Sequence, residues 1–422
     1  MTRAELDPVT RRWRVRVFTA TWLSYFGYYF SRKPFYIAKA TLEEQLGFDA
    51  ERLAFIGMAY LVAYTVGQFA AGWFGNRSGP RLMLLTGMLV TAGVNLTFGF
   101  AANWGTFAGL MVVNGLAQAT GWSGNVGSMA AWFTRRERGT VMGFWATNFQ
   151  AGGVAANTLA AWALGAHGYR WAFFAGSLVT LAIWAVVLLN QRDKPEDVGL
   201  PALVDDTDPT PEEHAAKGTG WTPAVRLNVA LLGAFYFNVK FIRYALWSWA
   251  PYLLQRYYGL AGDDAGFAST VFDVAGIAGV VFLGVASDRW FGGRRVGLSL
   301  VFLLAMVGAC LLLYLAGATS LVFFTVCLGL IGFSLYGPDA ILTSAGAIDV
   351  GTKRGATLAA GIINGLGSVG SVAQEFLLGR ALAGGVAENV GVVFGMLLTT
   401  AGLAAACLAI IVYRNRTGRA DL

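Results

Sequence analysis

The chain has 422 residues, of which 56% are hydrophobic and only 13% are charged, and its formal net charge is +7. This balance is far from that of a soluble domain and indicates an integral membrane protein. The lipid bilayer is therefore its expected surrounding, and no nucleic-acid partner is expected.

Hydrophobic runs long enough to cross a hydrocarbon layer of ~30 Å recur along the whole chain. They lie near residues 17–38, 53–75, 82–102, 106–133, 140–165, 169–190, 225–254, 264–286, 296–316, 320–348, 355–379 and 390–413. The first run is too long for the hydrophobic part of a signal peptide, so we expect it to be retained. The sequence thus predicts an all-α membrane protein with twelve transmembrane helices.

The 31 Lys and Arg residues are distributed unevenly between the two sides of these spans. Twenty-two fall on the side that would hold both termini, and five fall in loops on the other side: Lys39, Arg52, Arg170, Arg256 and Arg380. Because loops rich in Lys and Arg stay in the cytoplasm, we expect both termini there, in a multi-pass protein of the bacterial cytoplasmic membrane. The remaining four fall inside predicted spans: Arg32, Lys33, Lys240 and Arg243.

A polar segment at residues 191–223, rich in Pro, Asp, Glu and Gly, separates the sixth and seventh spans. It predicts a cytoplasmic linker between two six-helix bundles, residues 1–190 and 224–422. The halves also repeat one pattern at a displacement of 211 residues: Tyr25, Tyr29, Arg32 and Tyr36 are spaced as Tyr236, Lys240, Arg243 and Trp247. Two pseudo-symmetric bundles are a transporter plan that holds its substrate near mid-membrane.

Arg32 and Arg243 each lie near the middle of a predicted span, where a cation is costly and an arginine cannot lose its proton. One explanation is an internal ion pair with an acidic residue of the spans, and these lie only in the second half: Asp273, Asp339 and Glu375. The other explanation, which we favour, is a cavity in which the two arginines face each other unpaired and bind an anion. Two guanidinium groups nearly balance a phosphate monoester, which carries a charge of about −1.5 to −2.

Lys33 and Lys240 are further candidates for contact with this anion. Lys33 points about 100° away from Arg32 around the helix, whereas Lys240 lies one turn from Arg243 on the same face. Asp273, Asp339 and Glu375 are expected to balance charge or to couple transport to protons.

Several motifs spread over nearly the whole chain resemble one transporter family. They are "GYYFSRKPF", "NGLAQATGW", "AAWFTRRERG", "DKPEDVGLP", "FIRYALWSWAPYLL", "VAGIAGVVFLGVASDR" and "GFSLYGPDA". Together they are similar to the organophosphate:phosphate antiporter family of the major facilitator superfamily, which includes glycerol-3-phosphate and hexose-phosphate transporters.

The resemblance implies the major facilitator fold and alternating access by rocking of the two halves, with a phosphorylated small molecule entering against outgoing inorganic phosphate. It implies that Arg32 and Arg243 bind phosphate. The aromatic residues expected around them are Tyr25, Tyr29, Tyr64, Trp122 and Tyr336.

The resemblance also assigns residues outside this core. Asp273 matches an acidic residue that the family uses near its site. Gln68, which stands where the family often has Lys, is also expected to contact the substrate. Loop residues expected to stabilise one orientation of the bundles are Asn76, Arg77, Asp288 and Arg289. Because Gln68 and Phe149 replace a Lys and a His found in relatives, the organic part of the substrate is left open.

Two other functions remain open. The chain could carry a carboxylate or phosphonate, coupled to protons through Asp273, or it could be a membrane sensor that binds a sugar phosphate without moving it. An enzyme is not expected, because no span carries a nucleophile beside a base or the spacing of metal ligands. Neither a metal nor a cofactor is expected, and the chain is expected to be a monomer.

Overall fold

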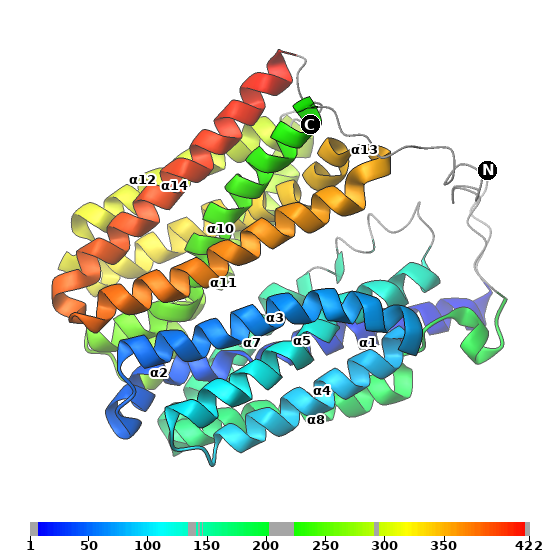
Figure 1. Cartoon of the computed structure of the whole chain (residues 1–422), viewed down its shortest axis with the longest axis horizontal. Coiled ribbons are helices and arrows are strands. Elements are labelled where there is room, and N and C mark those ends of the chain that lie inside the picture. Colours follow the sequence, from blue (N-terminus) through cyan, green and yellow to red (C-terminus); the bar gives the residue numbers. More distant parts are fainter. Residues whose placement is uncertain are drawn as a thin grey trace. The chain divides into compact units, whose positions relative to one another are not determined.

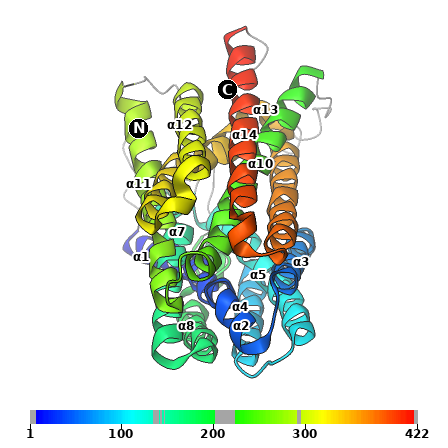
Figure 2. The ribbon, with the colours of Figure 1, turned by 90° about the vertical axis from the view of Figure 1, so that its left-hand side faces the viewer.

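The computed structural model describes residues 7–133, 141, 144–145, 147–201, 223–290 and 295–417. Within these ranges, the side chains of residues 69, 71–78, 123, 126, 130, 287–290, 295, 341 and 343–361 are not part of the description. The regular elements of the described residues are all helical (Figures 1 and 2). The expected all-α fold is therefore confirmed.

The helices follow the predicted hydrophobic runs. They are α1 Pro8–Phe30, α2 Lys33–Leu46, α3 Ala50–Ser78, α4 Pro80–Phe98, α5 Trp104–Trp132, α7 Thr147–His167, α8 Tyr169–Asn190, α10 Pro223–Arg256, α11 Gly262–Trp290, α12 Arg295–Ala316, α13 Leu321–Ala383 and α14 Val386–Arg416, with short 3₁₀ turns η1 Pro195–Val198 and η2 Gly317–Thr319.

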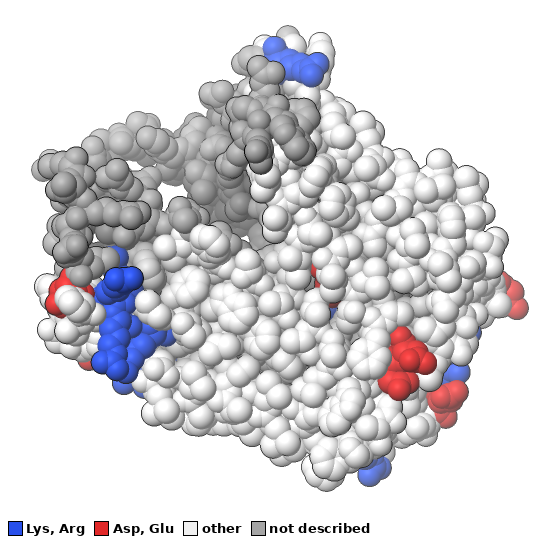
Figure 3. All heavy atoms as spheres, turned by 180° about the vertical axis from the view of Figure 1, so that it is seen from behind, with Lys and Arg blue, Asp and Glu red and all other residues white. Residues whose placement is uncertain are grey.

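Seven of the described segments have the length and hydropathy needed to cross a membrane. They are Pro80–Phe98, Tyr169–Asn190, Pro223–Arg256, Gly262–Ala286, Val296–Thr319, Leu321–Ala340 and Val386–Arg416. Figure 3 shows a related property on one face: most of the described surface carries no charged side chain. Such a surface is what contact with lipid requires.

The first expected span is broken in two. α1 ends at Phe30, and α2 begins at Lys33 with Pro34 in its first turn. Proline has no N–H and disfavours helical dihedrals in the residue before it, so it is placed most easily where a helix starts. The backbone N–H groups of Ser31 and Arg32 donate to the carbonyls three residues earlier. Arg32 therefore lies in a tight turn rather than inside a helix.

The tenth and eleventh expected spans lie in one continuous helix, α13. The sequence predicted an interruption near residues 351–355, "GTKRG", but that segment has no proline to end a helix. The predicted boundary is therefore wrong at this point.

The described residues form two compact units. The first comprises those within residues 1–35 and 62–215, and the second those within 36–61 and 216–422. In the first unit α1 packs against α5, α7 and α8, and α4 packs against α5 and α8. In the second unit α10 packs against α11, α13 and α14, and α12 packs against α13 and α14. Residues 36–61 thus pack with the second unit although they come from the first half of the sequence.

Each unit contains a similar close contact between two of its own helices. Gly152 of α7 lies against the backbone of Phe26 in α1, and Gly370 of α13 lies against the backbone of Phe237 in α10. A Cβ atom on either glycine would meet the phenylalanine carbonyl. Phe26 and Phe237 are 211 residues apart, which is the displacement of the sequence repeat, so the repeat extends to packing.

Candidate substrate-binding residues

Arg32 is buried in the turn between α1 and α2, with 5% of its surface exposed. Its Nε atom donates to Gln118 Oε1 on α5 at 2.8 Å. The guanidinium carbon lies 4.9 Å from the ring centroid of Tyr29 and 5.3 Å from that of Tyr64. A guanidinium group is attracted by aromatic faces at these distances, so two rings and an amide oxygen orient Arg32.

Gln118 is itself held in one orientation. Its Nε2 atom donates to Thr91 Oγ1 and Asn114 Oδ1, each at 3.1 Å. Asn114 Nδ2 in turn donates to the carbonyl oxygen of Ser31 in the turn, also at 3.1 Å. Because both contacts use the amide N–H group, the Gln118 oxygen is directed at Arg32.

Gln118 and Asn114 were not among the residues expected to bind substrate. The sequence does contain a pattern that could have identified them: two amide side chains, four residues apart in a hydrophobic run, lie on one helical face. Both lie in the motif "NGLAQATGW", whose resemblance to the transporter family does not by itself point to these two amide side chains.

The structure brings the expected aromatic residues of the first unit together. The Tyr25 ring lies 6.2 Å from Tyr29, 5.6 Å from Trp122 and 5.8 Å from Trp145, measured between centroids. Trp145 was not among the expected residues. Tyr25, Tyr29, Tyr64 and Trp122 thus form one cluster with Arg32.

The other two candidates of the first unit are Lys33 and Gln68. Lys33 is the first residue of α2 and only 1% exposed. Gln68 is partly buried on α3, one turn beyond Tyr64. Both therefore remain predictions as substrate contacts.

Arg243 in α10 has an acidic partner. Its Nη1 atom lies 2.9 Å from Asp339 Oδ2 of α13, and its guanidinium carbon lies 5.1 Å from the Tyr336 ring. The Tyr336 hydroxyl donates to Asp273 Oδ1 at 2.6 Å. Three expected residues, Asp273, Tyr336 and Asp339, therefore gather beside Arg243. The expectation of an unpaired arginine is wrong here, because Asp339 supplies an opposite charge.

Lys240 lies one turn away on α10 and has only neutral hydrogen-bond acceptors among the described residues. Its Nζ atom donates to Asn364 Oδ1 at 2.9 Å and to Ser368 Oγ at 3.3 Å, and it lies 4.7 Å from the Tyr236 ring. The side chain is buried, with 8% of its surface exposed. Lys240 adds a second positive charge close to the Arg243–Asp339 pair.

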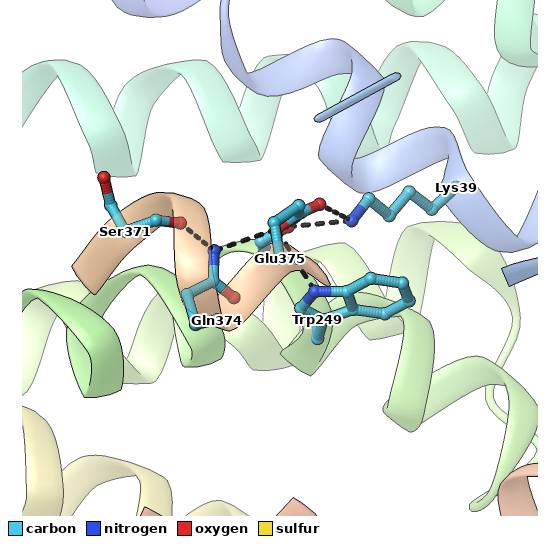
Figure 4. Close-up of polar contacts among 6 residues, drawn as sticks. Lys39, Trp249, Ser371, Gln374 and Glu375 are labelled. Atoms are coloured by element: carbon cyan, nitrogen blue, oxygen red, sulfur yellow. Dashed lines mark hydrogen bonds and ion pairs between the residues drawn. The ribbon is translucent and has the colours of Figure 1, made fainter. Parts of the chain in front are cut away.

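Glu375 does not lie beside these cations. It pairs with Lys39 of α2 at 2.5 Å, and both side chains are fully buried (Figure 4). The expectation that Lys39 lies in a loop is therefore wrong. The side chains of the four expected loop residues, Asn76, Arg77, Asp288 and Arg289, lie outside the described residues.

The arrangement suits an oxyanion. In the first unit the Arg32 guanidinium group lies beside the Gln118 amide oxygen and the rings of Tyr29 and Tyr64. In the second unit Arg243 pairs with Asp339, and Lys240 lies one turn away on the same helix. Buried cations of this kind bind phosphate or carboxylate oxygens through charge-assisted hydrogen bonds.

Comparisons with known proteins match the chain to a family of membrane transporters. The model of the Major Facilitator Superfamily matches residues 21–375. A glycerol-3-phosphate transporter of Bacillus subtilis (strain 168) is 30% identical over 386 residues, which cover 88% of this chain and 86% of that protein. The membrane sensor protein UhpC of Escherichia coli (strain K12) is 27% identical over 389 residues, which cover 90% of this chain and 88% of that protein.

Solved structures show the same fold. A bacterial homologue of the human lysosomal transporter Spinster, in an inward-facing and unoccupied conformation, aligns with a TM-score of 0.73 at 14% identity. The alignment covers 97% of this chain and 98% of that chain. At this identity the likeness concerns the fold alone.

Proposed function

Because the chain belongs to the Major Facilitator Superfamily and is a membrane transporter rather than an enzyme, we propose that it exchanges an organic phosphate for inorganic phosphate. The exchange proceeds by alternating access, with the two six-helix bundles rocking about the substrate. The observation that carries the proposal is the setting of Arg32, which is fixed by the Gln118 oxygen and two tyrosine rings.

We expect the phosphoryl group to accept hydrogen bonds from residues of both units. Arg32 contributes from the first unit, and Arg243 and Lys240 contribute from the second. Since Asp339 already occupies one face of Arg243, phosphate has to compete with this carboxylate or use the remaining guanidinium N–H groups. Asp339 would then hold Arg243 while no substrate is bound and release it when the anion arrives.

The relatives support phosphorylated substrates as a class. Besides the Bacillus subtilis protein, a probable hexose phosphate transport protein of Chlamydia pneumoniae is 27% identical, and the alignment covers 87% of this chain and 85% of that protein. Because these relatives differ in the organic part, we propose a phosphoryl group as the shared feature and leave the rest of the substrate to experiment.

A binding screen tests the proposal directly. The purified protein is titrated with phosphorylated metabolites, with matched carboxylates and phosphonates, and with inorganic phosphate as competitor. We expect saturable binding of one or more organic phosphates, displaced by inorganic phosphate. Binding of a carboxylate or phosphonate that phosphate cannot displace would favour the other anion carrier instead.

The variant Arg32→Lys provides the control at the site. Lysine keeps the charge but loses the planar guanidinium fork that bonds two oxygens at once. We expect near-complete loss of phosphate binding and of transport while the protein remains inserted and folded. Transport at the parental rate by this variant would contradict a role for Arg32 in binding.

A sensor remains the second candidate because one relative is the membrane sensor protein UhpC. Binding of an organic phosphate without any flux across liposomes would favour it. Exchange of labelled phosphate by the purified protein would favour the transporter.

A further inference from the structure

Glu375 on α13 is the centre of a buried polar cluster that the proposed substrate contacts do not include. Its carboxylate accepts hydrogen bonds from Lys39 Nζ at 2.5 Å, Ser248 Oγ at 2.8 Å, Gln374 Nε2 at 2.9 Å and Trp249 Nε1 at 3.2 Å (Figure 4). Lys39 Nζ also donates to Ser248 Oγ at 2.8 Å. Both charges are thus removed from water and satisfied by each other and by neutral donors.

The contact continues along one face of α2. Tyr36, Lys39 and Glu43 are spaced three and four residues apart, which places them on the same side of a helix. The Tyr36 ring lies 4.7 Å from the Trp247 ring, and Glu43 Oε2 lies 2.8 Å from Arg256 Nε. Three side chains on one face of α2 therefore contact α10 and α13 within the second unit.

Small residues bring the start of α3 close to the same place. A Cβ atom on Gly57 would overlap the Glu375 carboxylate, and a Cβ atom on Gly379 would overlap the side chain of Ala54. The first turns of α3 thus lie directly on α13 around Glu375.

The two sides of this contact come from different sequence repeats. α2 and the start of α3 belong to the first half of the chain, whereas α10 and α13 belong to the second. Tyr36 and Trp247 even occupy equivalent positions of the repeat, since they are 211 residues apart. A transporter whose halves rock cannot keep every such contact throughout its cycle.

An ion pair is well suited to a contact that must open. Burying two charges costs desolvation energy that nearly cancels their attraction, and replacing a buried pair by apolar residues is often neutral or stabilising. When the surfaces separate, both charges regain water. The ion pair therefore favours one alignment of α2 on α13, while adding little to the free energy needed to separate the two helices.

We propose that Lys39 and Glu375 form a releasable lock between the two sequence repeats. The lock is closed in this structure, where residues 36–61 pack on the second unit. It opens in another step of the transport cycle, when this segment leaves α10 and α13 and both charges become hydrated. The proposal needs alternating movement but no particular substrate, so it goes beyond the proposed function.

Cysteine labelling tests the lock without any substrate. Ala54→Cys is introduced after Cys310, Cys327 and Cys407 have been replaced by serine, and its rate of reaction with a water-soluble maleimide is measured. Ala54 is only 4% exposed in the closed contact, so labelling reports opening. Glu51→Cys, at an exposed position one turn earlier, is the matched control.

Lys39→Met leaves the Glu375 charge buried without its cation, which favours the open state. We expect labelling at Ala54→Cys to become about tenfold faster or more, and labelling at Glu51→Cys to stay constant. The double variant Lys39→Met/Glu375→Met should return the rate to the parental value or below it, because an apolar pair closes the contact without desolvation. An unchanged rate in folded Lys39→Met protein would overturn the lock.

Cross-linking distinguishes a lock from a permanent attachment. Glu43→Cys and Arg256→Cys, which replace the partly exposed outer pair, are joined by a short bifunctional methanethiosulfonate reagent in proteoliposomes. We expect phosphate exchange to stop and to recover when the cross-link is reduced, while single-cysteine controls keep their activity. Full exchange by the cross-linked protein would overturn the proposal, since residues 36–61 would then move permanently with the second unit.

The two experiments also separate this inference from the proposed function. If the parental protein exchanges no phosphate, the organophosphate proposal fails, while the labelling rates still decide whether the lock opens. If exchange is normal but the labelling rates do not respond to Lys39→Met, only the lock fails.

Discussion

At the scale of single residues, the two repeat-related arginines lie in different surroundings. Arg32 contacts an amide oxygen and aromatic rings, whereas Arg243 is ion-paired with Asp339. The sequence offered these arginines as candidates but not their partners, because Asp339 is 96 residues away from Arg243. Such a partner depends on how two distant helices pack. The resemblance singled out Asp273, whereas the structure pairs Arg243 with Asp339.

The pairing of Arg243 leads to a prediction for Asp339→Asn. Removing the carboxylate takes away the competitor for the guanidinium group, so we expect inorganic phosphate to bind about tenfold more tightly. The ligand-free protein should melt at a lower temperature, because the partly buried Arg243 loses its counter-charge. Titration calorimetry and melting curves with and without phosphate measure both effects.

Asp264→Asn is the control for this experiment, since Asp264 is an exposed carboxylate in the first turn of α11. It should change neither affinity nor melting temperature. If phosphate bound Asp339→Asn no more tightly than the parental protein, competition between the carboxylate and phosphate would be excluded.

Gln118 is expected to act as a positioning residue for Arg32. Gln118→Met keeps the volume of the side chain but removes the oxygen that accepts from Arg32 Nε. Because a hydrogen bond to a charged group contributes about 1.5–3 kcal/mol, we expect phosphate affinity to fall by about tenfold or more. Gln118→Glu should reduce it further, since its carboxylate would pair with Arg32 and compete with phosphate. Parental affinity in Gln118→Met would show that the amide is dispensable.

At the scale of helices, hydrophobic runs predicted most elements because each run is long enough to cross the hydrocarbon layer. The break between α1 and α2 was missed although Pro34 is visible in the sequence, because apolar residues continue on both sides of Arg32, Lys33 and Pro34. The predicted first span ended at residue 38, so Lys39 was placed in the loop that follows it. A lysine at the end of a hydrophobic run is equally compatible with an exposed loop and with a buried pair, and only the position of Glu375 decides between them.

The packing of α8 against the end of α1 supports the turn that carries Arg32. A Cβ atom on Gly176 would meet the carbonyl oxygen of Phe30, the last residue of α1. Overpacking at such a contact costs about 1–3 kcal/mol. We therefore expect Gly176→Ala to lower both the melting temperature, by several degrees, and the affinity for phosphate, as measured by thermal shift with and without ligand.

Gly93→Ala on α4 is the matched control, because nothing lies within 4 Å of a Cβ atom at Gly93. Alanine is favoured over glycine inside a helix by about 0.5–1 kcal/mol. The control should therefore be as stable as the parental protein or slightly more stable. Equal behaviour of the two variants would contradict a tight α1–α8 contact.

At the scale of the whole molecule, the internal repeat was readable because charged and aromatic residues recur at one displacement. The structure extends this repeat to the glycine contacts of Phe26 and Phe237. The grouping of residues 36–61 with the second unit was not predictable, since it depends on which repeat these helices pack against in one conformation. The sequence repeat identifies the two halves, whereas the packing of residues 36–61 belongs to one conformation of the protein.

Obligatory exchange is the property that belongs to the molecule as a whole. We expect bound phosphate to stabilise the buried cations Arg32 and Lys240 through charge-assisted hydrogen bonds that the empty protein cannot form. These bonds should be strongest while the substrate is enclosed, so the loaded protein should change orientation much faster than the empty one. In proteoliposomes we expect rapid uptake of labelled phosphate when phosphate is present on both sides, and uptake slower by at least about tenfold when the lumen holds none. Liposomes with Arg32→Lys protein serve as the background. Equal rates with and without luminal phosphate would exclude obligatory exchange and favour a carrier whose empty form returns freely.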